Sequence, residues 1–122
     1  MGYAGAGKVA IELSMNQALQ LWRTTLIASV RNDGPDLSAR QMAILLIIYG
    51  EAPPHTVRGL AAQLNISKPA VTRALDTMGR LDFTRRKRDE TDKRNVLVQR
   101  TIKGSVFLSD FADLIKKQAA QL

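Results

Sequence analysis

The stretch that decides the fold is TVRGLAAQLNISKPAVTRALDTMGRLDFTRRKRDETDKRNVLVQRT, residues 56–101. Its first part predicts a helix over 56–64, which Thr56 caps by accepting from an exposed N–H group of the first turn. Asn65 and Ile66 form a turn, because asparagine tolerates a left-handed backbone. Ser67 then caps a second helix over 67–81, with Pro69 in the first turn, where the missing N–H is not needed.

The second helix has two chemically different sides. Apolar residues recur at helical spacing and are expected to pack on the preceding helices: Val71, Ala74, Leu75 and Met78. The opposite side and its leading end are polar or basic and can face a partner: Ser67, Lys68, Pro69, Thr72, Arg73, Asp76 and Arg80. Asp76 on this side is expected either to hold Arg73 or Arg80 in position or to limit contact with the backbone of the partner. Taken alone, the helix also fits a plain amphipathic helix with a solvated charged face.

The segment after this helix favours a nucleic-acid partner. Residues 83–88 and 95–101 are short strand-like segments around a polar tip, which predicts a hairpin. From Arg58 to Arg100 there are eleven Lys and Arg against five Asp and Glu, so most of the net charge of +7 lies here. Two helices followed by a basic hairpin predict a winged helix-turn-helix that binds double-stranded DNA. Arg73 would then read guanine, with further contacts from Arg88, Lys93 and Arg94 in the hairpin.

These residues resemble the MarR family of bacterial transcriptional regulators. The resemblance runs from about Leu37 to Gly104 and includes LSARQMAILL, LAAQLNISKPAVTRALD and RRKRDETDKRNVLVQRTIKG. It implies that Arg94 enters the minor groove and that Asp92 braces the wing by pairing with Arg86. Asp82 stands where the family usually has glycine, although aspartate also tolerates a positive φ. The chain ends at Leu122, whereas family members usually continue into another helix that helps to build the dimer.

Composition limits the other classes of function. The chain has no cysteine and one histidine, which excludes disulfides and zinc–cysteine sites. It also has no glycine-rich phosphate loop and no pair of carboxylates suited to acid–base catalysis. We therefore expect that the protein is not an enzyme and that it binds no metal or cofactor. The longest apolar run, 42–49, is far shorter than the roughly 20 residues of a membrane span. With no secretory signal at its start, the protein is expected to be soluble and cytoplasmic.

The remaining segments predict a mainly α protein with a small β-wing. A glycine-rich start, 1–11, is expected to be frayed, and a helix follows over about 14–30. Ser38 and Gln41 form a capping box before a buried helix that includes 42–49, and Thr101 caps a final helix. The predicted parts are a tail and dimerisation helix (1–34), the winged domain (35–101) and a C-terminal dimerisation helix (102–122).

The two terminal helices carry apolar stripes that exceed what a small domain needs. The predicted dimerisation residues are Met15, Leu19, Trp22, Leu26, Phe107, Phe111, Leu114 and Ile115. A homodimer would place two recognition helices about 34 Å apart, for a pseudo-palindromic operator. The alternative is that both stripes fold back on their own core.

A regulator of this family often releases DNA when a small aromatic ligand binds. Trp22, Tyr49 and His55 are the candidates for lining such a crevice, although core or loop roles fit each of them as well. Repression is the expected mode of action. A winged module that binds RNA or a protein instead remains the alternative, although few aromatic residues lie in the basic region to stack on bases.

Overall fold

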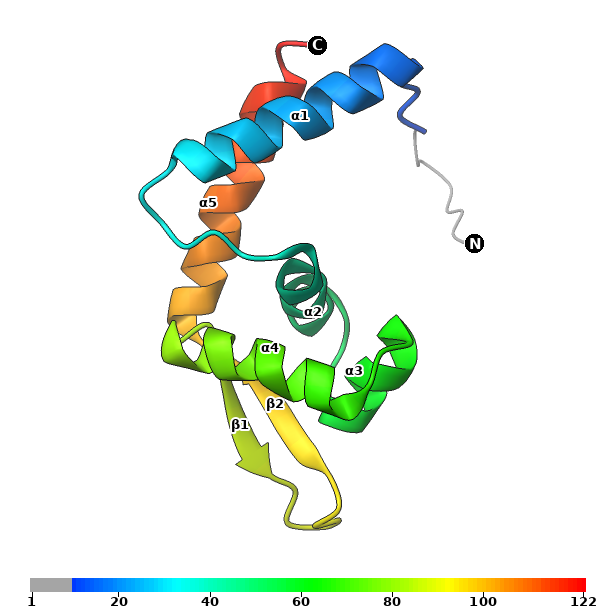
Figure 1. Cartoon of the computed structure of the whole chain (residues 1–122), viewed down its shortest axis with the longest axis vertical. Helices are drawn as coiled ribbons and strands as arrows, with labels where there is room; N and C mark the ends of the chain where they lie inside the picture. Colours follow the sequence, from blue (N-terminus) through cyan, green and yellow to red (C-terminus); the bar gives the residue numbers. More distant parts are fainter. Residues whose placement is uncertain (1–9) are drawn as a thin grey trace.

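The computed structural model describes residues 10–122, which form five helices and a two-stranded sheet (Figure 1). The predicted fold class, mainly α with a small β-wing, is confirmed, and so is the winged helix-turn-helix. The expectation that residues 1–11 are frayed falls almost wholly outside the described residues. No helix within 10–122 is both long enough and apolar enough to cross a membrane.

Capping residues set where the helices begin. Helix α1 (Met15–Arg31) follows Ser14, and α2 (Ala39–Gly50) follows Ser38, each with a complete capping box to a glutamine three residues on. Helix α3 (Val57–Leu64) follows Thr56 and ends at Asn65, which takes the left-handed conformation with φ 54°. Helix α4 (Lys68–Arg80) follows Ser67, and α5 (Ile102–Ala119) follows Thr101. Each cap side chain accepts from the backbone N–H three residues later. The sequence predicted the caps at Ser38, Thr56, Ser67 and Thr101, and the structure adds Ser14.

The wing is an antiparallel pair, β1 (Thr84–Arg88) and β2 (Val96–Arg100). It is slightly shorter than predicted, because Phe83 turns into the core and the Asn95 amide donates to the Asp92 carbonyl within the tip. Asp82 takes φ 58° between α4 and β1, so the aspartate does adopt the positive φ expected there. An isolated bridge from Thr56 to Leu97 joins the start of α3 to β2.

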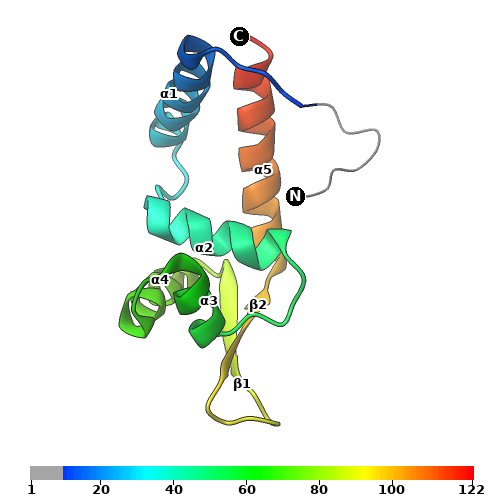
Figure 2. The ribbon, with the colours of Figure 1, turned by 90° about the vertical axis from the view of Figure 1, so that its right-hand side faces the viewer.

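The core lies where α2, α3, α4 and the base of the wing meet. Its buried residues are Ile44, Leu45, Ile48, Leu60, Ala61, Val71, Ala74, Leu75, Met78, Phe83 and Val98. All four residues of the predicted α4 stripe are among them, which confirms that side as the packed one. Helices α1 and α5 lie side by side as an arm, and the wing projects from the opposite end of the molecule (Figures 1 and 2).

The two apolar stripes of the arm differ in their surroundings. On α1, Met15, Leu19 and Trp22 are 74%, 57% and 60% exposed. On α5, Phe107 and Phe111 are half-buried, and Phe107 stacks on Phe83 with ring centroids 4.5 Å apart. The α1 stripe therefore stays uncovered in the single chain, whereas much of the α5 stripe turns toward its own chain.

Candidate nucleic-acid interface

The outer side of α4 presents the side chains that the sequence assigned to DNA. Lys68, Pro69, Arg73 and Arg80 are exposed, and Thr72 is half-buried. Ser67 uses its side chain to accept from the Ala70 amide at 3.2 Å, so its hydroxyl already serves as the helix cap. Because the Ala70 and Val71 amides donate to Ser67 and Pro69 has no N–H, it is the helix dipole that favours a nearby anion at this N-terminus.

Asp76 is paired with the wing rather than with its own helix. Its Oδ1 lies 2.6 Å from Arg86 Nη2 of β1. The expectation that Asp76 positions Arg73 or Arg80 is wrong, because Arg80 instead donates to Thr77 Oγ1 at 3.2 Å. The pairing arises because strand alternation places Arg86 on the same face of β1 as the buried Thr84, and this face turns toward α4.

The wing tip is organised by two carboxylates. Asp89 accepts from the Thr91 hydroxyl at 2.7 Å and from the Thr91 amide at 3.0 Å. These bonds, the hydroxyl first, lower the pKa of the Asp89 carboxyl below its ordinary value. The tip is thus a turn built by side-chain acceptors, which explains the acidic residues within a basic segment.

Asp92 binds Arg94 and does not pair with Arg86. It accepts from Arg94 Nε at 3.0 Å, Arg94 Nη2 at 2.9 Å and the Arg94 amide at 3.1 Å. The predicted Asp92–Arg86 brace is therefore wrong, since Asp92 and Arg86 each have another partner. The Arg94 side chain is the main cause that lowers the pKa of Asp92, and Asp92 in turn raises the pKa of Arg94. The guanidinium is held at the tip in one orientation and remains largely exposed.

Two basic residues outside the predicted set also shape the interface. Arg58, in the first turn of α3, adds a smaller electrostatic lowering of the Asp92 pKa, which places a further cation near the wing tip. Arg100 donates to the carbonyl oxygens of Ile48 at 2.8 Å and Glu51 at 2.9 Å, so it anchors β2 to the end of α2. The Thr56–Leu97 bridge and the hydrogen bond from the Val98 amide to the His55 carbonyl, at 2.8 Å, bring the start of α3, and with it Arg58, beside the wing.

The three predicted ligand-lining residues lie in different surroundings. Tyr49 places its hydroxyl within hydrogen-bond distance of the Phe83 and Thr101 carbonyl oxygens, at 2.8 and 3.0 Å, and accepts from the Thr101 amide at 2.8 Å. His55 lies in the loop before α3, with Nε2 3.1 Å from the Glu51 carbonyl oxygen. Trp22 is exposed on α1. Tyr49 thus joins α2 to the wing and α5, and none of the three lines the cavity described next.

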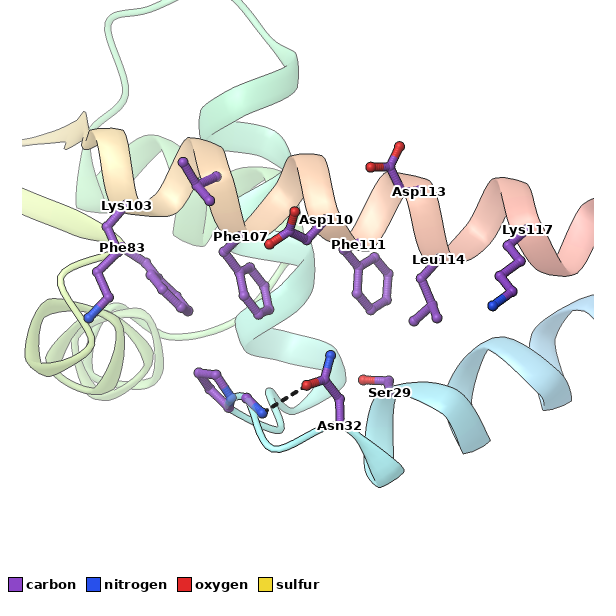
Figure 3. A pocket seen from close by; sticks show the side chains of 13 residues that line it. Ser29, Asn32, Phe83, Lys103, Phe107, Asp110, Phe111, Asp113, Leu114 and Lys117 are labelled. Atoms are coloured by element: carbon purple, nitrogen blue, oxygen red, sulfur yellow. Dashed lines mark hydrogen bonds between the residues drawn. The ribbon is translucent and has the colours of Figure 1, made fainter.

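A cavity of about 500 Å³ lies between α5 and the end of α1 (Figure 3). Phe83, Phe107 and Phe111 form its aromatic wall, with Phe107 and Phe111 ring centroids 6.3 Å apart. Figure 3 shows Phe107, Phe111 and Leu114 pointing from α5 toward Ser29 and Asn32. Lysine and aspartate side chains border the cavity as well: Lys103, Asp110, Asp113 and Lys117. Phe107 and Phe111 were predicted to serve dimerisation from their spacing, which does not show which side of a helix its own chain covers; their place in a dimer stays a prediction.

Comparisons with known proteins agree with this geometry. The model of the MarR family matches residues 37–96. A mutant of MarR from E. coli is similar at 25% identity with a TM-score of 0.67, over 87% of this chain and 74% of that chain. A MepR–DNA complex from S. aureus is similar at 19% identity with a TM-score of 0.65, over 84% and 78%. YusO from Bacillus subtilis is similar at 19% identity with a TM-score of 0.72, over 87% and 74%. The curated proteins contain no match.

Proposed function

Because the chain belongs to the MarR family, whose members are transcriptional regulators and not enzymes, we propose that it is a repressor that binds a pseudo-palindromic operator as a homodimer. The observation that carries the proposal is the joining of two basic elements at one end of the molecule. The outer side of α4 and the wing are tied by the Asp76–Arg86 pair. Such a pair of elements fits adjacent grooves of duplex DNA.

In this proposal, residues 35–101 make the DNA contacts. Helix α4 enters the major groove, where Arg73 donates to the two acceptors of guanine. Pro69 and Thr72 approach base edges closely, while Lys68, Arg80, Arg88 and Lys93 neutralise phosphates. Arg94 enters the minor groove, to which its positive charge is attracted. The hydrogen bonds that Arg94 donates to Asp92 support this role, because they fix the guanidinium before DNA arrives.

Segments 1–34 and 102–122 are assigned to the dimer. The uncovered stripe on α1, with Trp22 60% exposed, supports burial against a second copy of the chain. Ile115 on α5 is also exposed and extends the apolar surface of the arm. A two-fold pair would place the two α4 helices about 34 Å apart, one turn of duplex DNA. Because the proposed partner is DNA, the protein is proposed to act in the cytoplasm.

Ligand control is assigned to the cavity between α5 and the end of α1. Its wall of Phe83, Phe107 and Phe111 suits a small aromatic compound. In this proposal, these phenylalanines replace the predicted ligand-lining residues, which were Trp22, Tyr49 and His55. The compound releases DNA only if it binds the DNA-free conformation more tightly than the DNA-bound one.

The first experiment is selection of duplexes from a random-sequence library by the wild-type protein, followed by affinity measurements with Arg94→Ala. We expect a selected site with two-fold symmetry. Arg94→Ala should weaken binding by at least about fivefold, while Arg73→Ala should cost about 1–3 kcal/mol and relax one base position. Lys116→Ala on α5 removes an equal charge far from the wing and is the control. Stronger competition by single-stranded RNA than by duplex DNA, or an Arg94→Ala affinity equal to that of the control, would reject the proposal.

A further inference from the structure

Asp76 occupies a position where a carboxylate opposes DNA binding. Helical spacing places it on the outer side of α4, between Arg73 three residues before and Arg80 four residues after. A negative charge there repels phosphates, and it lies within reach of two arginines that the helix offers to DNA. Some other group must therefore satisfy Asp76 if those arginines are to remain available.

The wing supplies that group. Of the three ion pairs within the described residues, only Asp76–Arg86 joins two separate elements, since Arg85–Asp82 and Arg94–Asp92 are local. The Asp76 and Arg86 side chains are 45% and 36% exposed, so the pair lies at the open corner between α4 and β1. Arg73 has no ion pair and no side-chain hydrogen bond among residues 10–122.

The register of the wing fixes the reach of Arg86. Arg86 lies opposite Val98, which is buried against the core, while Arg88 lies opposite Val96 nearer the tip. The Arg86 side chain therefore leaves a strand position that cannot shift without exposing Val98. The ion pair holds this anchored side chain against α4 and so limits rotation of the wing about its base.

We propose that Asp76 is a positioning residue that makes binding specific: it holds Arg86 against the recognition helix, away from phosphates, and thereby leaves Arg73 free to read bases. The proposal rests on the DNA-binding function given above. The proposal predicts opposite effects on DNA affinity for loss of Asp76 and for loss of Arg86. Loss of Asp76 releases a cation beside the DNA, whereas loss of Arg86 leaves a carboxylate that captures Arg73 or Arg80.

Asp76→Asn keeps the side-chain shape and removes the charge. We expect a three- to tenfold higher affinity for a scrambled duplex, because Arg86 gains a phosphate. The slope of log affinity against log salt should steepen by about 0.9, the value for one added phosphate contact. Preference for the selected duplex over the scrambled one should fall. Asp36→Asn, at an exposed position in the loop between α1 and α2, makes the same change of charge outside α4 and the wing and should leave preference unchanged.

Arg86→Gln should act in the opposite direction. The uncompensated Asp76 should lower affinity for the selected duplex about tenfold and lower affinity for the scrambled duplex much less, so preference again falls. The double variant, Asp76→Asn with Arg86→Gln, removes both the released cation and the uncompensated carboxylate. It should recover part of the preference that each single variant loses, a result that simple loss of structure would not give.

The measurement is fluorescence anisotropy with a duplex selected by the wild-type protein and a scrambled duplex of equal length and composition, between 50 and 200 mM salt. Circular dichroism melting of each variant checks that it is folded. If wild-type protein fails to bind duplex DNA, the proposed function fails. If wild-type protein binds with preference but Asp76→Asn keeps the wild-type salt slope and preference, or if the double variant is worse than both single variants, Asp76 does not have this role.

Discussion

Replacing Gly104 with alanine is expected to destabilise the protein, because Gly104 lies where α2, α5 and the base of the wing meet. Gly104 is buried in the first turn of α5. A Cβ atom added there would meet the Tyr49 hydroxyl and the Phe83 carbonyl oxygen at separations that real Cβ atoms do not tolerate. Neither neighbour can move easily, since Phe83 O is backbone and the Tyr49 hydroxyl accepts from the Thr101 amide at 2.8 Å.

The magnitude follows from three contributions. Forcing a methyl group into a filled site costs about 1–3 kcal/mol. Displacing the Tyr49 hydroxyl leaves part-buried backbone groups of Phe83 and Thr101 without their partner, which costs about 1–3 kcal/mol more. Alanine in a helix returns at most about 1 kcal/mol relative to glycine. The net loss should be about 1–5 kcal/mol, with about 3 kcal/mol as the central value, against the roughly 5–15 kcal/mol that stabilises a folded domain.

The assay is urea unfolding followed by circular dichroism, at one fixed protein concentration because a dimer would link unfolding to dissociation. Gly79→Ala is the matched control, since a Cβ atom at this exposed position of α4 meets nothing within 4 Å. It should stabilise the protein by about 0.5–1 kcal/mol. In a Tyr49→Phe background, Gly104→Ala should cost less than in wild type, because the nearest of the three opposing atoms, the Tyr49 hydroxyl oxygen, is gone. Equal stability of Gly104→Ala and wild type, or strict additivity with Tyr49→Phe, would refute the packing of this junction.

Three further substitutions or titrations test other parts of the structure. Carboxyl NMR should give Asp92 a pKa below the ordinary 3.8, rising back toward it in Arg94→Ala. A carboxyl group whose pKa is lowered by folding contributes stability when the pH is above its ordinary pKa. This contribution is lost as the pH falls through the lowered pKa. The wing tip should therefore keep the Asp92–Arg94 pair at neutral pH and lose it only in acid. Thr84→Val should raise the free energy of unfolding in urea by about 1 kcal/mol, because the buried Thr84 hydroxyl has no hydrogen-bond partner within the described part of the chain. Trp22→Glu should leave the fold intact and give a monomeric mass by light scattering, whereas a dimeric mass would remove Trp22 from the proposed interface.

The elements of this fold were predictable because their signals are local. Ser38, Thr56, Ser67 and Thr101 each lie three residues before the amide that they accept from, so neighbouring residues alone specify where those helices begin. The buried stripe of α4 follows from helical periodicity in the same way. The positive φ of Asp82 is also a local property, since it depends on which residues tolerate that conformation beside a helix end.

The pairings between elements were not predictable from local signals. The resemblance to the MarR family implied that Arg86 pairs with Asp92, six residues away, and nothing local pointed to Asp76, ten residues away. The strand register decides otherwise, because Arg86 lies opposite Val98 on the face turned toward α4, while Asp92 lies in the tip beside Arg94. Charge pairing across elements depends on where folding brings the backbones together, which spacing along the chain does not contain.

Phe83 connects the proposed ligand site to the proposed DNA contacts. Its ring belongs to the aromatic wall of the cavity and stacks on Phe107, while its backbone lies between the end of α4 and the start of β1. Its amide donates to the Met78 carbonyl at 2.8 Å, and its own carbonyl oxygen lies 2.8 Å from the Tyr49 hydroxyl. A ligand that displaces the Phe83 ring must therefore disturb either the last turn of α4 or the base of the wing. Asp76 and Arg86 lie on those same two elements. Such a displacement would therefore change the angle between α4 and the wing, which their ion pair holds.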